Sequence, residues 1–363
     1  MAPQVVNLSG QSVSLSEDNI LRLYAKVKAH GHPRGSILFL ALWSLCLLST
    51  FAVVLGYGLR QKLSLIKRLD EKDRLRLIAD AGVKKTMAWF RQQPPKAYAG
   101  LADEWSNDPA LFKDINIEEG KFSIAYTYYD EQAGFSNTRY GLVDEESKIN
   151  LNKASQDVLE RLFKLGAKLS EMEAQDLAAS IIDWRDKDSQ LSVPLGSAED
   201  SYYRNLEFPY EAKDADFDSL DEALLVKGLS QEIFEKIKGY ITIYGEGKVN
   251  INTASRAVLL ALGFDQGTVE EIISLRAATD RVSGTSDDNI FEAVSDIVPK
   301  LSQAYHLSDS EITQISQLVE QNLTVYSNNF MIRSLAKLNN HRNTLEVISV
   351  INRAGKILYW YEY

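Results

Sequence analysis

The strongest pattern along the chain is an uncharged, apolar run near its N-terminus. Residues Ser36 to Leu59 contain no charged side chain, and the basic residues Arg34 and Arg60 flank them. As a helix rising about 1.5 Å per residue, this run spans about 36 Å, enough to cross a hydrocarbon core of about 30 Å. A cleaved secretory signal would need a shorter apolar stretch and a small-residue cleavage site. The run therefore predicts a transmembrane helix over 36–59.

The apolar positions continue at helical spacing into the charged segment that follows. Leucine, isoleucine and other apolar residues recur from Leu63 to Met87, and Pro94 and Pro95 come next. Because proline lacks the backbone N–H group and clashes with the preceding turn, these two residues end a helix. We expect one helix over 36–93, half of it transmembrane and half amphipathic.

Two other regions alternate apolar and polar residues with a period of two, which is typical of strands. Asn339-Asn340 and Ala354-Gly355 supply hairpin turns in the second region. The expected strands are Phe122–Tyr128, Asn137–Val143, Phe330–Leu338, Thr344–Ile351 and Ile357–Tyr363. Since these strands flank a helical block, we expect one antiparallel sheet, packed on the amphipathic half of the long helix.

The block between these strands repeats itself at an offset of 100 residues. Lys148-Ile-Asn-Leu-Asn-Lys-Ala-Ser155 recurs as Lys248-Val-Asn-Ile-Asn-Thr-Ala-Ser255. The serine of each copy suits a helix N-terminus, because its side-chain oxygen can accept from a free backbone N–H group. The expected helices are 156–165, 171–185, 220–227, 231–240, 256–262 and 268–278.

These patterns together predict an α+β fold with five segments. A long N-terminal transmembrane and amphipathic helix packs on an antiparallel sheet, and a large inserted all-α domain contains two helix-hairpin-helix-like repeats that start near 148 and 248. The expected boundaries are 1–35 for a leader, 36–93 for the helix, 94–147 for the first part of the sheet domain, 148–325 for the insertion and 326–363 for the strands that complete the sheet.

The composition disfavours several classes of function. The formal net charge of −10 disfavours a protein whose main task is to neutralise phosphates, because that affinity comes from lysine and arginine. The single cysteine, Cys46, lies inside the apolar run and excludes an intramolecular disulfide. The four histidines lie in no protease or triad context and no glycine-rich phosphate loop is present, so we do not expect an enzyme.

One acidic segment has the composition of a metal site. Five acids fall within 18 residues: Asp183, Asp186, Asp188, Glu199 and Asp200. Crowded hard oxygen ligands suit calcium, which takes six to eight oxygens, whereas zinc would favour cysteine or histidine. A solvated acidic loop without an ion is the alternative.

The start of the apolar run resembles a prepilin cleavage site. Arg34 and Gly35 directly precede Ser36, and such sites are cut after the glycine on the cytoplasmic face. That cut would leave Ser36 as the mature N-terminus and export the C-terminal part, although the basic residues counted on both flanks favour the opposite orientation. Most members of the class carry glutamate as the fifth mature residue, and here Leu40 takes its place. A carboxylate in lipid is costly unless it is paired, so a subunit without it need not fit beneath another.

Later motifs resemble the general secretory pathway protein K family, the minor pseudopilins of type II secretion. They are YGLVDEESKINLNKAS (140–155), IIDWRDKDS (181–189), GSAEDSYY (196–203), FDSLDEALLVKGLS (217–230) and VNINTAS (249–255), in the order that the family shows. The likeness covers the chain from about residue 34 to its end, and the leader of 35 residues is longer than is usual in the family.

The resemblance implies a pilin-like sheet and a structural tip subunit that caps the pseudopilus and helps to initiate it. It implies a single-pass protein of the bacterial inner membrane with a periplasmic C-terminal domain, and a methylated N-terminus after cleavage. The implied partners are the minor pseudopilins I and J, other pseudopilins and the prepilin peptidase. The family holds calcium in its inserted helical domain, a role that we carry to the five acids above.

A membrane-anchored DNA receptor is the alternative function, because VNINTAS followed by a short helix also opens helix-hairpin-helix modules. These modules bind phosphate through backbone N–H groups in a glycine-rich turn between two helices. The corresponding turns here are Lys164–Lys168 and Leu262–Gln266, which lack the double glycine, and the second contains an acid. We therefore expect no nucleic-acid partner.

Overall fold

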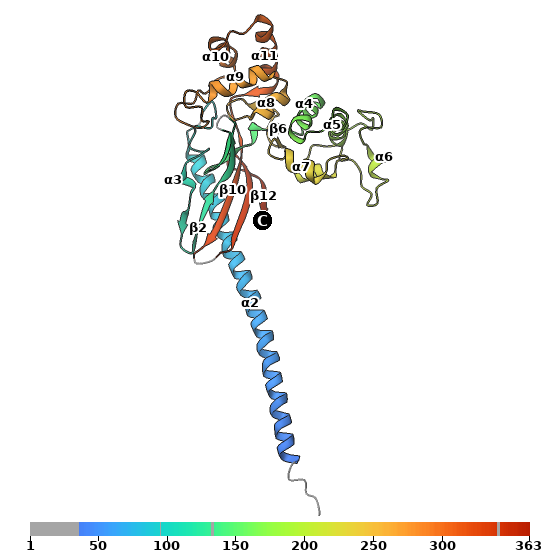
Figure 1. The fold of residues 1–363 in the computed structure, drawn as a ribbon, viewed down its shortest axis with the longest axis vertical. Helices are drawn as coiled ribbons and strands as arrows, with labels where there is room; N and C mark the ends of the chain where they lie inside the picture. The colour runs from blue at the N-terminus through green and yellow to red at the C-terminus, as the bar shows by residue number, and fades with distance from the viewer. Residues whose placement is uncertain (1–35, 95, 132–133, 340–341) are drawn as a thin grey trace, which may run out of the picture. The chain divides into compact units, whose positions relative to one another are not determined.

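The computed structural model describes residues 36–94, 96–131, 134–339 and 342–363. The chain divides into two compact units, Met1–Asp70 and Glu71–Tyr363. Helix α2 (Ser36–Gln92) contributes residues to both units, and the second unit contains the sheet and the remaining helices (Figure 1). The expected leader 1–35, including Gly35, lies outside the described residues.

Helix α2 confirms the expected long helix, which ends one residue earlier than predicted. Within the described part of the chain it is the one helix long and apolar enough to cross a membrane. In its second half, Leu75, Ile78, Ala79, Val83 and Phe90 are buried at helical spacing against the sheet. The segment after Asp70 is therefore amphipathic, as its pattern indicated.

The main sheet is antiparallel throughout and lies along the second half of α2 (Figure 1). Its order is β1-β2-β10-β11-β12, and β5 pairs with β10. The strands are β1 (Ile115–Ile117), β2 (Gly120–Ile124), β5 (Val143–Asp144), β10 (Asn329–Leu338), β11 (Thr344–Asn352) and β12 (Ile357–Glu362). The short helix α3 (Pro109–Phe112) precedes β1, with Asp108 as its cap.

The prediction of one continuous strand over Phe122–Tyr128 is wrong. The chain leaves the main sheet after Ile124, and β3 (Tyr126–Asp130) pairs instead with β4 (Phe135–Arg139) in a separate two-stranded sheet. A large apolar or aromatic residue stands at every second position from Phe122 to Tyr128, so the change of partner at Ala125 leaves little mark on the sequence pattern.

The segment between β5 and β10 contains most of the helices, and four short strands, so it is not purely helical. Strand β6 (Ile149–Asn150) pairs in parallel with β7 (Ile241–Thr242), and β8 (Val249–Asn250) pairs in parallel with β9 (Leu323–Thr324). The helices are α4 (Gln156–Leu162), α5 (Glu171–Arg185), α6 (Asp200–Tyr203), α7 (Gln231–Ile237), α8 (Arg256–Leu262), α9 (Gln266–Arg276), α10 (Ile297–Ala304) and α11 (Asp309–Asn322). Where the pattern predicted a helix over 220–227, a 3₁₀ helix covers Asp221–Leu225.

Two hydrophobic cores lie inside the second unit. One joins α2 to the main sheet, and Phe330 is at its centre, in edge contact with the rings of Phe90 and Trp105. The other fills the helical segment and includes Leu159 of α4 and Leu259 of α8, both fully buried.

The two copies of the sequence motif have matching hydrogen bonds. In the first copy, the side chain of Asn152 bonds both backbone groups of Phe217, and Arg185 at the end of α5 donates to the carbonyl of Ala154. In the second copy, Asn252 bonds both backbone groups of Phe291, and Arg276 at the end of α9 donates to Ala254. In the first copy the chain after α5 therefore returns to Asn152, and in the second copy the chain after α9 returns to Asn252.

Candidate metal centre

The acidic segment begins on α5, a well-defined helix. Ser170 caps its N-terminus through a capping box with Glu173, and its last turn contains Asp183. Asp183 is fully buried and accepts from the backbone N–H of Ser192 at 3.0 Å. It therefore fixes the middle of the loop that follows α5 to the last turn of the helix.

Three of the five predicted acids converge. Asp186, Asp188 and Glu199 each place a carboxylate oxygen within 4.8 Å of the others. Asp186 is half-buried, Asp188 is exposed and Glu199 is buried. The loop 186–199 brings together acids that are up to 13 positions apart in the sequence.

Asp200 lies outside this group. One of its carboxylate oxygens accepts from the backbone N–H of Ala212 at 2.9 Å, and the other accepts from Arg204 at 2.7 Å. Its charge is therefore already compensated at the start of α6.

Sequence reasoning missed Asp214, whose charge acts on both Asp186 and Glu199. The backbone N–H of Asp214 donates to the carbonyl of Trp184 at 3.0 Å, which holds this returning segment against the end of α5. Asp214 has a positive φ of 52°, which is uncommon for a residue with a side chain. Its stretch, Asp214-Ala-Asp-Phe-Asp, is visibly acidic, but only the folded chain brings it to the group.

The carboxylates of the group repel one another. Burial, followed by the charges of Asp183 and Asp186, raises the pKa of Glu199 to about 7. Burial, followed by the charge of Asp188, raises the pKa of Asp186 as well. A positive charge among them would relieve this repulsion.

Two oxygens of the group also favour a bound cation. Asp186 Oδ1 and Glu199 Oε1 are buried and lack a hydrogen-bond partner. Buried polar atoms are normally paired, so two orphaned carboxylate oxygens in one group suit a bound cation or water. Carboxylate oxygens of this kind fit a hard cation such as calcium.

The loop around the group has a rigid scaffold. Lys227 donates to the carbonyls of Gly196 and Ser197, at 2.8 and 3.1 Å. Trp184 of α5 packs edge-on against the ring of Tyr203. Between these supports Leu195 is 95% exposed and has a positive φ of 66°.

A second polar cluster, which sequence reasoning also missed, joins the helical segment to the main sheet. Asp144 of β5 is buried and accepts from Asn250, Thr253 and Ser327, at 3.1, 2.5 and 2.6 Å. Nearby, Glu146 accepts from both the backbone and the side chain of Asn329. Burial, followed by the charge of Asp144, raises the pKa of Glu146 to about 8.

At the second of the two turns between helices, Leu262–Gln266, a side chain of the protein itself occupies the helix N-terminus. At the second turn, the carboxylate of Asp265 accepts from the backbone N–H of Thr268 at 3.0 Å and caps α9. A carboxylate therefore occupies the helix N-terminus at which a phosphate would bind. The first turn runs through the π-helical segment Phe163–Ala167 and ends at Lys168.

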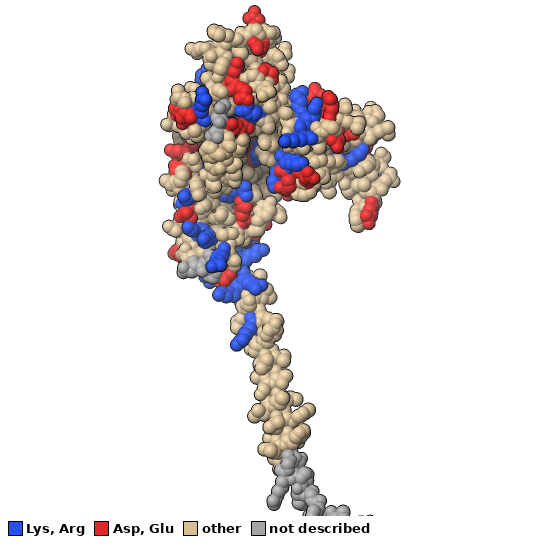
Figure 2. Space-filling view, in the orientation of Figure 1, with Lys and Arg blue, Asp and Glu red and all other residues tan. Residues whose placement is uncertain are grey.

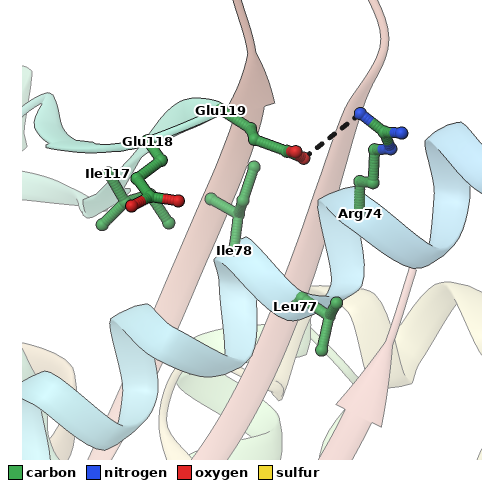
Figure 3. A pocket seen from close by; sticks show the side chains of 6 residues that line it. All are labelled: Arg74, Leu77, Ile78, Ile117, Glu118 and Glu119. Atoms are coloured by element: carbon green, nitrogen blue, oxygen red, sulfur yellow. Dashed lines mark hydrogen bonds and ion pairs between the residues drawn. The ribbon is translucent and has the colours of Figure 1, made fainter.

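A shallow groove of about 240 Å³ lies where α2 passes the turn between β1 and β2 (Figure 3). Ile78 of α2 points toward this turn, and Arg74 pairs with Glu119 at 3.3 Å. Leu77 and Ile117 also line the groove. Three of the six lining residues are apolar and three are charged.

The cleavage junction is only partly described. Gly35 lies outside the described residues, and Ser36 is the first residue of α2. Leu40 lies in the first turns of this helix and is exposed in the isolated chain.

Comparison with known proteins gives consistent results. A family model described as "Type II secretion system (T2SS), protein K" matches residues 140–246. The type II secretion system protein K of Aeromonas hydrophila is 26% identical over 286 residues, which cover 77% of this chain and 80% of that protein. A chain in the crystal structure of the GspK-GspI-GspJ complex from the enterotoxigenic Escherichia coli type 2 secretion system matches with a TM-score of 0.57 and 17% identity, over 84% of this chain and 98% of that chain. At this identity the structural likeness shows a shared fold.

Proposed function

We propose that the chain is a minor pseudopilin of the protein K family of type II secretion systems, and that it forms the tip of the pseudopilus. The observation that carries this proposal is the large segment between β5 and β10. A repeating filament subunit must leave room for a copy above and below it. A subunit with so large an insertion fits best at an end, where it caps the filament and helps to initiate it.

The same proposal fixes the orientation of the chain. Cleavage after Gly35 by the prepilin peptidase leaves Ser36 as the first residue of α2, and the C-terminal unit is exported to the periplasm. We expect mass spectrometry of the protein from the inner membrane to find an N-terminus at Ser36, methylated on its amine. An intact N-terminus in the assembled protein would contradict this orientation.

Two copies of one helical unit make up the exported insertion in this proposal. The matching bonds of Asn152 and Asn252 to their phenylalanines, together with those of Arg185 and Arg276, support a duplication. The first copy has the longer returning loop, which contains the acidic group, and the second has a shorter one.

We assign calcium to the acidic group of the first copy. Asp186, Asp188 and Glu199 would hold the ion, and Asp183 and Asp214 would add charge nearby. The two orphaned carboxylate oxygens support this assignment. Bound calcium would neutralise the group and fix the loop 186–199, in a chain whose single cysteine leaves no disulfide to do so.

The expected partners are the minor pseudopilins I and J, which the matched crystal structure names with GspK. The exposed apolar residues of α2 in the second unit are the proposed contact, and Leu77 is 67% exposed beside the groove of Figure 3. We expect Leu77→Asp to reduce the recovered complex by at least about tenfold, because a carboxylate in an apolar contact must be desolvated.

Co-purification of the full chain with its own I and J pseudopilins measures this effect. The matched control is Met172→Asp, which places the same charge on an exposed apolar position of α5. Recovery of the complex should be unchanged in the control. A wild-type chain that binds neither partner would refute the proposed function.

A further inference from the structure

A group of basic residues follows the uncharged part of α2. Arg60, Lys62, Lys67 and Arg68 lie within ten residues that contain no acid, and Asp70 is the first acidic residue after the span. All four side chains are exposed. Figure 2 shows basic side chains along this helix directly after a stretch without charge. We call these four residues the basic collar.

The collar begins where a bilayer would end. The span Ile37–Leu59 rises about 34 Å as a helix, slightly more than a hydrocarbon core of about 30 Å. Tyr57 is exposed near the end of the span, a position at which tyrosine commonly lies at the membrane interface. In a bilayer centred on this span, Arg60 and Lys62 would lie at the depth of the lipid headgroups.

The collar surrounds the helix. At about 100° per residue, Lys62 and Arg68 lie about 200° and 80° around the axis from Arg60. A contact with one partner helix would use a single face of α2. Charges on several faces instead suit a ring of headgroups around the helix.

In the exported orientation, which is part of the proposed function, the basic collar lies on the side where such residues are uncommon. If the C-terminal unit is exported, the collar lies on the side of the membrane where arginine and lysine near a span are disfavoured. The chain as a whole is acidic, with a formal net charge of −10 that already includes the collar. A dense group of basic residues at this one depth along α2 therefore indicates a negatively charged partner at the same depth.

We propose that the basic collar binds the headgroups of anionic phospholipids on the exported side of the inner membrane. Their phosphates complement the charge of the collar, and the long stems of lysine and arginine let the charges reach the headgroup layer. The contact sets the depth of α2 in the bilayer and holds the subunit there before assembly.

Lipid titration of the full chain in a neutral detergent tests the collar. Native mass spectrometry would count bound phosphatidylglycerol and phosphatidylcholine over a concentration series. We expect the wild-type chain to bind phosphatidylglycerol at least tenfold more tightly than it binds phosphatidylcholine. The triple variant Arg60→Gln/Lys62→Gln/Arg68→Gln should lose this preference, because three charges at about 1 kcal/mol each amount to about a hundredfold.

The matched control removes three charges elsewhere, as Lys153→Gln/Lys236→Gln/Lys238→Gln, and should leave the preference for phosphatidylglycerol intact. Inorganic phosphate at equal concentration should not displace the lipid. Equal lipid binding by the triple variant and wild type, or displacement by inorganic phosphate, would overturn the proposal.

A separate measurement distinguishes failure of the proposed function. Protease added to spheroplasts should digest the C-terminal unit if that unit is exported. Complete protection would refute the exported orientation and with it the proposed function, even if the collar binds lipid in detergent. Digestion of the C-terminal unit, together with unchanged lipid binding by the triple variant, would refute only the proposal that the basic collar binds lipid.

Discussion

Replacing Asp144 with alanine is expected to destabilise the folded chain by about 3 to 5 kcal/mol, because it leaves three buried donors without their acceptor and each unsatisfied group costs about 1 to 3 kcal/mol. Asn250, Thr253 and Ser327 would each lose a buried acceptor. At about 2 to 4 °C per kcal/mol for a domain of this size, the melting temperature should fall by about 10 °C. Thermal unfolding of the full chain in detergent, followed by tryptophan fluorescence, measures this shift.

The matched control is Asp216→Ala, which removes a carboxylate that is exposed and paired with Lys153 at 2.8 Å. Surface ion pairs contribute about 0 to 1 kcal/mol, so the melting temperature should change little. A similar, small shift in both variants would show that Asp144 does not stabilise the junction between the helical segment and the sheet.

Removal of calcium is expected to produce the second large effect. An ion at 100 times its dissociation constant stabilises the state that binds it by about 2.7 kcal/mol, so chelation should lower the melting temperature by about 5 to 10 °C. Asp188→Asn should lose most of this calcium-dependent shift, because it removes a charged oxygen from the group. Asp200→Asn is the control and should retain the shift, since Asp200 pairs with Arg204 instead.

The calcium effect should depend on pH. In chelator, the raised pKa of Glu199 means that the folded state binds a proton more tightly than the unfolded state does. Stability without calcium should therefore fall as pH rises from 4.5 to about 7, the ordinary and the folded pKa of this group. Calcium needs the deprotonated carboxylates, so its stabilising effect should grow over the same range. A calcium-independent melting temperature at pH 7.5, or equal loss of the shift in both variants, would refute the site.

Short-range pattern was sufficient to predict some elements to the residue. The helices Glu171–Arg185 and Arg256–Leu262 have the predicted bounds, because a serine caps each start and an apolar stripe continues along each helix. Helices α10 and α11 were not singled out from the sequence. The start of α9 was placed two residues late, because Asp265 and not a later residue caps it.

The acidic group shows where local information ends. Spacing alone placed Asp200 with Asp186, Asp188 and Glu199, whereas the chain direction at α6 turns its carboxylate towards Arg204. Asp214 comes to the group through a bond to the end of α5, a contact across 30 positions of sequence. No periodicity within either segment encodes that contact.

By itself, the sequence determined the long helix with its apolar run, the three C-terminal strands and the repeated motif, because each follows from periodicity and capping among near neighbours. The tertiary structure alone decided that β3 leaves the main sheet, that Asp144 is buried against the second motif, and which acids face one another. These features depend on burial and charge repulsion between residues far apart in the chain. Such residues meet only in the folded chain, so local sequence patterns do not reveal these contacts.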